Sequence, residues 1–150
     1  MSGARADIVR CDNCGTKNRV PASATGVPKC GKCGVALPWV TDAGDDDFDQ
    51  VVGAATLPVV VDLWAEWCGP CRMVSPALEQ LAHQMAGRLK VVKVDVDKAP
   101  ALAQRFDARS IPTLLLVRNG AVTSRQVGGA PAHLIKQWVD GALAGAGPGA

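Results

Sequence analysis

The sequence predicts an α/β protein, in which helices flank a central mixed sheet, with a small cysteine-rich module in front of it. From residue 38 onward, strand and helix patterns alternate in the order β-α-β-α-β-α-β-β-α. The six cysteines form three pairs, and two residues separate the members of each pair. The first two pairs lie in a segment without helical or strand periodicity. We therefore expect a cysteine module at residues 1–37, a sheet domain at residues 38–144 and a flexible tail at residues 145–150.

Composition excludes several classes of protein. The chain has 150 residues, of which 48% are hydrophobic and 20% charged, as in a folded domain and unlike a disordered chain. Its net charge is only +2, and aromatic residues make up 4% with no tyrosine. A nucleic-acid surface needs a basic patch or stacking rings. The composition therefore argues against a general nucleic-acid binder.

The chain shows no segment that would enter a membrane. Its longest apolar runs, such as residues 57–61 and 114–117, are far shorter than the roughly 20 residues that a bilayer requires. The first seven residues lack the apolar core of a signal peptide. We expect a cytoplasmic monomer, and in that reducing compartment six cysteines favour metal binding or redox catalysis over a disulfide scaffold.

The first half of the sheet domain contains two predicted strands and two predicted helices. Residues 38–41 form a short strand candidate, and the acidic run at residues 45–47 is typical of the capped, solvated start of a helix. Residues 59–65 are almost continuously apolar, as in a central strand covered on both faces. Apolar residues from 74 to 85 recur at helical spacing, and Pro76 is expected to kink that helix.

The second half follows the same alternation. Residues 91–96 predict a strand, and residues 99–106 predict a short helix. Residues 111–118 and 121–127 flank an Asn-Gly pair, which is a strong signal for a hairpin turn. Apolar positions between residues 134 and 142 line one face of a final helix.

The third cysteine pair lies between a predicted buried strand and a predicted helix. Cys68 would sit at the helix N-terminus, where free N–H groups and the helix dipole stabilise a thiolate. Only the thiolate attacks a disulfide, and Cys71 lies close enough to attack a mixed disulfide on Cys68. This setting predicts thiol–disulfide exchange; a zinc-binding or idle pair is the alternative.

Residues 61–71, with the sequence VDLWAEWCGPC, resemble the active-site signature of the thioredoxin family, and the similarity extends over residues 39–144. The resemblance implies a thioredoxin fold and a protein-disulfide reductase. In that family Cys68 corresponds to the nucleophile and Cys71 to the resolving thiol. It also implies disulfide-containing client proteins, and an NADPH-dependent thioredoxin reductase that restores the dithiol.

The resemblance assigns further roles near the dithiol. Asp62 matches a buried carboxylate that transfers a proton for the resolving cysteine, and burial would raise its pKa into a useful range; a merely hydrogen-bonded carboxylate is the alternative. Lys93 matches a lysine beside that carboxylate, against the alternative of a solvent-facing strand residue. Gly128 matches a glycine that lets a bound peptide approach, or else ends a strand. Ile111–Pro112 matches a cis-proline that holds the substrate backbone. The implied substrate-binding residues are Trp67, Gly69, Pro70, Ile111, Pro112 and Gly128.

The first two cysteine pairs fit a metal site. Their spacing, C-x2-C-x15-C-x2-C, is a four-thiolate zinc pattern, and it predicts one Zn²⁺ in a zinc ribbon. So small a segment buries too little apolar surface to fold alone, so the metal should provide its folding energy. With the WCGPC motif, the module resembles the zinc-containing thioredoxin-2 class of bacteria. The four expected ligands are Cys11, Cys14, Cys30 and Cys33.

Several readings stay open at this point. The module is structural, or it is a redox sensor that loses zinc to oxidants, or it binds a protein or nucleic acid. The chain as a whole is a reductase, a docking scaffold in which the thioredoxin domain mainly binds partners, or a disulfide isomerase or oxidase. His83 and His133 lie far in sequence from the cysteines, and both are expected to be surface or packing residues.

Overall fold

The computed structural model describes residues 5–144 and contains two sheets. A two-stranded antiparallel sheet pairs β1 (Ala6–Arg10) with β2 (Lys17–Pro21). In the larger sheet, with the order β3-β5-β4-β6-β7, β3 and β4 run parallel to β5, whereas β6 and β7 are antiparallel to their neighbours. Its strands are β3 (Val40–Asp42), β4 (Val59–Trp64), β5 (Lys90–Asp95), β6 (Thr113–Arg118) and β7 (Ala121–Val127).

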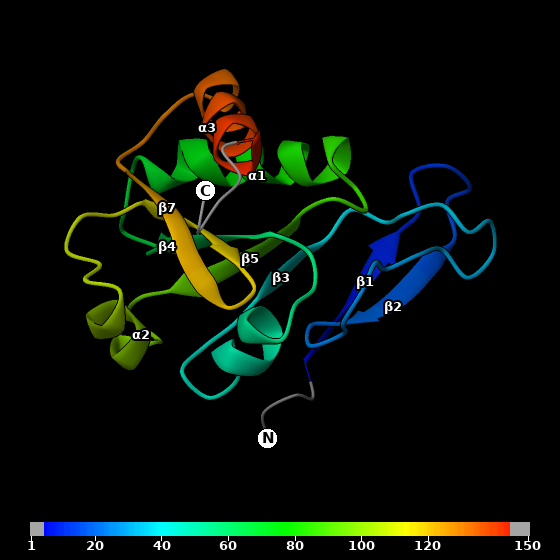
Figure 1. Ribbon diagram of the computed structural model, residues 1–150, viewed down its shortest axis with the longest axis horizontal. Helices are drawn as coiled ribbons and strands as arrows, with labels where there is room; N and C mark the ends of the chain where they lie inside the picture. The colour runs from blue at the N-terminus through cyan, green and yellow to red at the C-terminus, as the bar shows by residue number, and fades with distance from the viewer. Residues whose placement is uncertain (1–4, 145–150) are drawn as a thin grey trace.

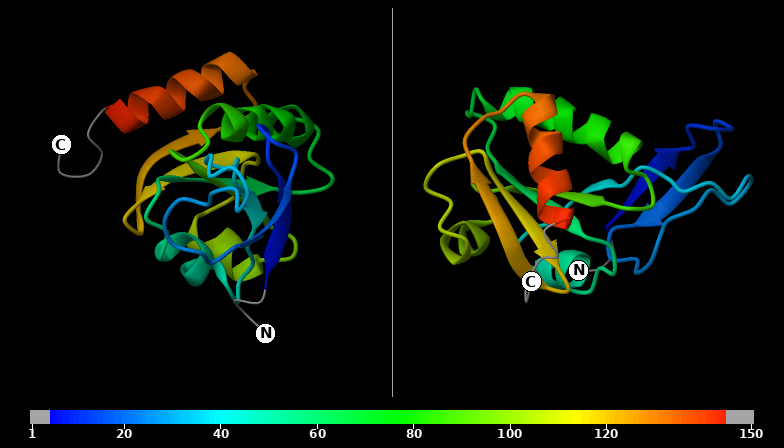
Figure 2. Two further views of the ribbon diagram at one scale, coloured as in Figure 1. Left: turned by 90° about the vertical axis from the view of Figure 1, so that its right-hand side faces the viewer. Right: turned by 45° about the horizontal axis from the view of Figure 1, so that its top comes forward.

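Helices cover both faces of the larger sheet, as Figures 1 and 2 show. One face carries α1 (Cys71–Gln84) and α3 (Ala132–Ala144), and the other carries α2 (Pro100–Arg105) and a π-helical turn, η1 (Asp49–Gly53). Each face buries its own apolar cluster, because β4, β5 and β6 send alternate side chains to opposite sides. The expected mixed sheet flanked by helices is confirmed. No helix between residues 5 and 144 is long and apolar enough to span a bilayer.

One local expectation was wrong, since the module contains the strands β1 and β2 although its sequence lacks strand periodicity. A helical segment follows the acidic run as expected, but it is the π-helical turn η1. The Asp45 carboxylate accepts hydrogen bonds from the amides of Ala101 and Leu102 at 3.1 and 2.9 Å, so it caps α2. The helix α1 contains Pro76 in its interior, and the kink expected there stays a prediction.

The module packs against the larger sheet at the edge formed by β3 (Figure 1). Its apolar cluster contains Cys11, Val20 and Cys30, and also the buried ring of Trp39, which lies just before β3. The half-exposed ring of His83, near the end of α1, contacts the Asp12 carboxylate at 2.6 Å. The module and the sheet domain therefore share an interface that includes Trp39 and His83.

Lys90, the first residue of β5, is fully buried in this interface. Its ammonium donates hydrogen bonds to the carbonyl oxygens of Ala22 in the module and Val51 in η1, each at 2.6 Å. The same nitrogen lies 4.1 Å from the centre of the Trp39 ring, a cation–π distance. Burial lowers the pKa of Lys90 to about 8. Lys90 thus joins the module to the sheet domain at the cost of desolvating its charge.

We expect Lys90→Ala to lower the free energy of unfolding at pH 7 by about 2–3 kcal/mol, because two buried carbonyls lose their donor. The charge-free control is Lys90→Met, which keeps most of the length. A lysine whose folded pKa is about 8 loses its proton in the folded state before it does so in the unfolded state. The wild type should therefore gain stability relative to Lys90→Met as pH rises from 8 to about 10. Urea unfolding at fixed free zinc measures both effects, and a relative loss over that range would contradict the prediction.

Candidate active site and metal centre

The loop after β4 brings Cys68 to the start of α1, where Cys71 is the first residue of the helix. The two cysteines form a disulfide with a Cα–Cα distance of 5.4 Å, and both are buried. The amide of Cys71 donates to the Cys68 sulfur at 3.2 Å. Once the bond is reduced, this amide and the positive end of the helix favour a Cys68 thiolate. The pair can therefore act as a redox-active dithiol.

Asp62 lies on β4 beneath α1, and the sheet register pairs it with Lys93 on β5. The Asp62 side chain is 1% exposed, and its Oδ1 atom has no hydrogen-bond partner. Burial raises the pKa of Asp62 to about 6, although the positive charge of Lys93 opposes the shift. The structure thus brings together the buried carboxylate and the lysine that the sequence pointed to.

Lys93 is half-buried, and its ammonium donates a hydrogen bond to the hydroxyl of Ser75 on α1. It also lies 5.4 Å from the centre of the Trp64 ring. Lys93, Ser75 and Cys71 line one cavity of about 370 Å³. Sequence reasoning missed Ser75, since only the packing of α1 on the sheet shows that it faces Lys93.

Pro112 lies directly before β6, and the Ile111–Pro112 bond is cis. The amide of Gly128 donates to the Pro112 carbonyl at 2.9 Å, and Gly128 has a φ of +97°, which favours glycine. Gly129, which sequence reasoning missed, lies against the redox loop: a Cβ atom added there would lie 3.0 Å from the Cβ of Pro70. A glycine pair after β7 therefore allows the two loops to approach.

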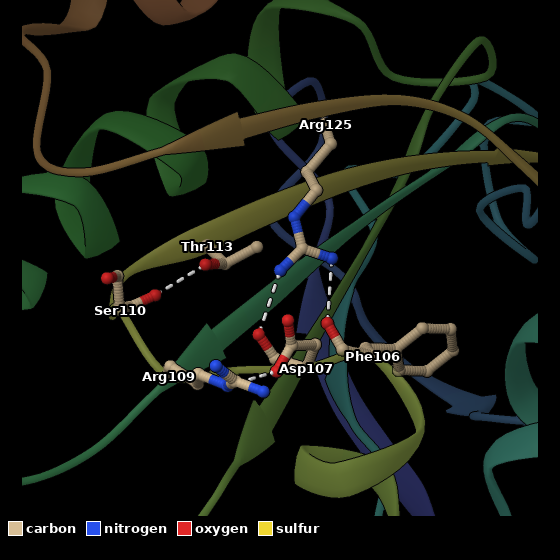
Figure 3. Close-up of polar contacts among 6 residues, drawn as sticks. All are labelled: Phe106, Asp107, Arg109, Ser110, Thr113 and Arg125. Atoms are coloured by element: carbon tan, nitrogen blue, oxygen red, sulfur yellow. Dashed lines mark hydrogen bonds and ion pairs between the residues drawn. The ribbon is translucent and has the colours of Figure 1, made fainter.

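Figure 3 shows how the loop that ends at Pro112 is fixed. Arg125 on β7 donates to the carbonyl oxygens of Phe106 and Asp107 at 2.7 and 3.0 Å. The Thr113 hydroxyl donates to the Ser110 carbonyl at 2.5 Å. These bonds connect both ends of the loop to the sheet, so the cis-proline is held in place from β6 and β7.

Apolar side chains around the disulfide face solvent. Trp67 is 69% exposed, and its indole N–H donates to an Asp97 carboxylate oxygen at 2.8 Å, which fixes the ring. Gly69, Pro70 and Met73 are also exposed. An exposed apolar patch of this kind is typical of a docking surface.

The four remaining cysteines form one cluster, with all sulfurs within 4.8 Å of one another. The sulfurs of Cys11 and Cys33 lie 3.6 Å apart, as do those of Cys14 and Cys30. Four thiolates around a tetrahedral zinc, with bonds of about 2.3 Å, lie about 3.8 Å apart. The cluster therefore fits a tetrahedral metal ion.

Hydrogen bonds around the four cysteines change the pKa values of their thiols. The amides of Cys33 and Lys32 lower the pKa of Cys30 to about 6, and the side chain of Asn13 lowers the pKa of Cys33, whereas burial and the neighbouring thiol of Cys33 raise the pKa of Cys11. A metal binds the deprotonated sulfur, so lowered pKa values favour binding at neutral pH. In each loop a glycine with positive φ follows the second cysteine and donates its amide to the carbonyl of the first. The four cysteines can bind a metal ion.

Comparisons with known proteins agree with this geometry. A family model described as thioredoxin matches residues 39–141. A thioredoxin of Haemophilus influenzae is 44% identical over 101 residues, which cover 67% of this chain and 94% of that protein. Thioredoxin 1 of a Nostoc species is 43% identical over 96 residues, which cover 64% of this chain and 90% of that protein.

A third relative matches a longer part of the chain. Thioredoxin C-3 of Corynebacterium nephridii is 38% identical over 136 residues, which cover 89% of this chain and 93% of that protein. Such a span exceeds residues 38–150, so the match includes part of the cysteine module. From the family match, together with a disulfide at the junction of β4 and α1, it follows that the chain belongs to the thioredoxin family and is a protein-disulfide oxidoreductase.

Proposed function

We propose that this chain reduces disulfide bonds of client proteins in two exchange steps. The Cys68 thiolate attacks one sulfur of the client disulfide, so that a mixed disulfide forms and the other client sulfur leaves as a thiolate. Cys71, as a thiolate, then attacks the Cys68 sulfur, which forms the Cys68–Cys71 disulfide and releases the second client thiolate. Both client thiolates are protonated from solvent. Two electrons pass to the client, and the chain ends oxidised.

The oxidised chain needs a two-electron donor to return to its dithiol form. Members of the thioredoxin family are generally reduced by thioredoxin reductase. We infer an NADPH-dependent thioredoxin reductase as the donor for this chain. The exposed side chains of Trp67 and Pro70 beside the buried disulfide support docking of another protein at this site.

Asp62 is the residue that we infer to accept the proton of Cys71 in the second step. With a pKa of about 6, its carboxylate is mostly ionised at pH 7, whereas a free thiol is mostly protonated. Lys93 lies opposite Asp62 and lines the cavity that Cys71 also lines. A buried base that accepts the proton of the resolving thiol generates its thiolate where water is scarce.

We infer that client segments bind in extended form between the redox loop and the cis-proline loop. The exposed ring of Trp67, the glycine backbone at positions 69 and 128 and the position of Pro112 beside Gly128 support this surface. The residues assigned to it are Trp67, Gly69, Pro70, Ile111, Pro112 and Gly128.

We further propose that the chain is of the zinc-containing thioredoxin-2 class and has a zinc module at residues 1–37, a thioredoxin domain at residues 38–144 and a tail at 145–150, which lies outside the described residues. One Zn²⁺ would be held by Cys11, Cys14, Cys30 and Cys33 and would stabilise the module's fold. Cys14 and Cys33 are exposed, and this favours a second candidate role, in which oxidants attack the thiolates and release the metal.

The main support for the proposed reductase activity is the Cys68–Cys71 disulfide at the N-terminus of α1. The reduction potential of this disulfide tests the proposal. After equilibration with dithiothreitol buffers, we expect a potential near about −270 mV, the value typical of thioredoxins. With thioredoxin reductase and insulin, NADPH should be consumed. A potential near about −120 mV, typical of strong oxidants, would favour an oxidase. Partners captured equally well by wild type and by the Cys68→Ser/Cys71→Ser double variant would favour a scaffold.

A further inference from the structure

Ser75 is placed to act on the chemistry of Cys71 without touching the sulfur. It lies one helical turn after Cys71 on α1, and both residues line the cavity of about 370 Å³. Its hydroxyl accepts a hydrogen bond from the Lys93 ammonium. Glu66 and Arg72 also line this cavity. Ser75 thus holds the Lys93 ammonium in a cavity that the cation of Arg72 also lines.

Lys93 has two carboxylates as possible partners. Because β5 lies between β3 and β4, the register places Lys93 opposite Asp42 on one side and Asp62 on the other. Two residues before Asp42, Asp62 and Lys93 on their strands, a valine packs beneath α1 in each case; the three are Val40, Val60 and Val91. Because side chains alternate along a strand, the two carboxylates and the lysine also lie on the α1 face of the sheet. Among the ion pairs of residues 5–144, none joins Lys93 to either carboxylate.

The Asp42 side of Lys93 borders a second cavity, of about 700 Å³. Carboxylates dominate its lining, which contains Asp7, Asp42, Asp45, Asp46 and Asp95. Its other cations are Arg5 and Lys98. Burial, and then the charge of Asp7, raise the pKa of Asp42, whereas the charges of Arg5 and Lys93 oppose the shift. Lys93 itself lines this acidic cavity, so the cavity competes with the Ser75 hydroxyl for the ammonium.

We propose that Ser75 is a positioning residue for the resolving step, whose hydroxyl holds the Lys93 ammonium on the side of Cys71 and Asp62 and away from Asp42. The inference rests on the proposed role of Asp62 as proton acceptor. With the ammonium in place, the Asp62 carboxylate is stabilised. Without the hydroxyl, attraction by Asp42 and Asp95 draws the ammonium away, and Asp62 keeps its proton to higher pH.

The first measurement titrates Asp62 by carboxyl ¹³C NMR in the oxidised, zinc-loaded full chain. We expect the midpoint of Ser75→Ala to rise by about 0.5–1 pH unit and that of Asp42→Asn to fall. Ser75→Thr keeps a hydroxyl and should stay near the wild type. Alanine favours helices more than serine does, so Ser75→Ala is expected to fold. An unchanged midpoint in Ser75→Ala overturns the proposal.

The second measurement follows the resolving step itself. The reduced chain is mixed with the aromatic disulfide 5,5′-dithiobis(2-nitrobenzoate), and Cys71 attack is read from the release of the second thionitrobenzoate. Near pH 6, Ser75→Ala should be about 3- to 5-fold slower than the wild type, with little difference at pH 8 and recovery in Ser75→Thr. Equal rates at pH 6 overturn the proposal. Asp62→Asn separates the two claims: if it keeps the wild-type rate and pH profile, the proposed role of Asp62 fails, whatever the NMR midpoints show.

Discussion

Insulin reduction by the Cys68→Ser variant is expected to be at least about 1,000-fold slower than by the wild type, because a serine hydroxyl is not ionised near neutral pH and cannot form the mixed disulfide. The amide of Cys71 and the start of α1 stabilise a charge that this variant no longer forms. The fold should be retained, since the substitution changes one atom. The rate of NADPH consumption in a coupled assay with thioredoxin reductase measures the loss.

The matched variant is Cys71→Ser, which carries the same substitution three residues away. It should be as slow in turnover, but it should accumulate one client molecule per chain, joined through Cys68, because no thiol resolves the mixed disulfide. Mass spectrometry under non-reducing conditions detects the adduct. Trapping by Cys68→Ser instead, or turnover by either variant near the wild-type rate, would contradict the assigned order of attack.

The redox half of the site could be predicted because its signals are local in the sequence. A continuous apolar run predicts β4, a helical spacing predicts α1, and the cysteine pair between them follows from both. The hairpin of β6 and β7 follows from one Asn-Gly turn. Asp62 and Lys93 could be named from the family resemblance, but that they face each other is set by the register of β4 and β5.

Other features depend on contacts between distant segments. A lysine at the start of a strand, such as Lys90, has the pattern of an exposed end, and only the packing of the module buries it. The hydroxyl of Ser75 matters because α1 crosses above β5. The strands β1 and β2 escaped prediction because neither of their five-residue segments, ADIVR and KNRVP, alternates strictly between apolar and polar residues.

Removal of the metal is expected to have the largest effect on stability. The module's cluster contains only a few buried residues, among them Cys11 and Cys30, so the proposed metal–thiolate bonds are expected to take the place of most of a normal core. In small zinc modules the apparent binding free energy is about 10–16 kcal/mol at pH 7, and the fold is lost without the metal. A chelator strong enough to strip the ion should therefore unfold β1 and β2, which hydrogen exchange of their amides would detect.

The effect should reach the thioredoxin domain. Trp39 packs in the apolar cluster that contains Cys11 and Cys30, so unfolding of the module exposes its ring. The Lys90 ammonium donates to the Ala22 carbonyl, so unfolding also removes one acceptor of this buried charge. A loss of about 2 kcal/mol would lower the Tm of the thioredoxin domain by roughly 10 °C. Cys30→Ser should reproduce the effect of the chelator, whereas Lys32→Ser, which changes an exposed neighbour, should not. An unchanged Tm after complete removal of the metal would contradict the shared interface.

The same preparation separates the structural role of the metal from the sensing role. Zinc per chain and free thiols are counted before and after graded peroxide, starting from the reduced protein. If only Cys68 and Cys71 oxidise while zinc is retained, the module is structural. The amides on Cys30 and the Asn13 contact to Cys33 keep thiolate character in the cluster, and Cys14 and Cys33 are exposed. Thiolates react with peroxide, and a bound metal protects them. Release of zinc at peroxide doses that also oxidise the dithiol would make the module a sensor. Loss of the metal would then loosen the contact between Lys90 and the module.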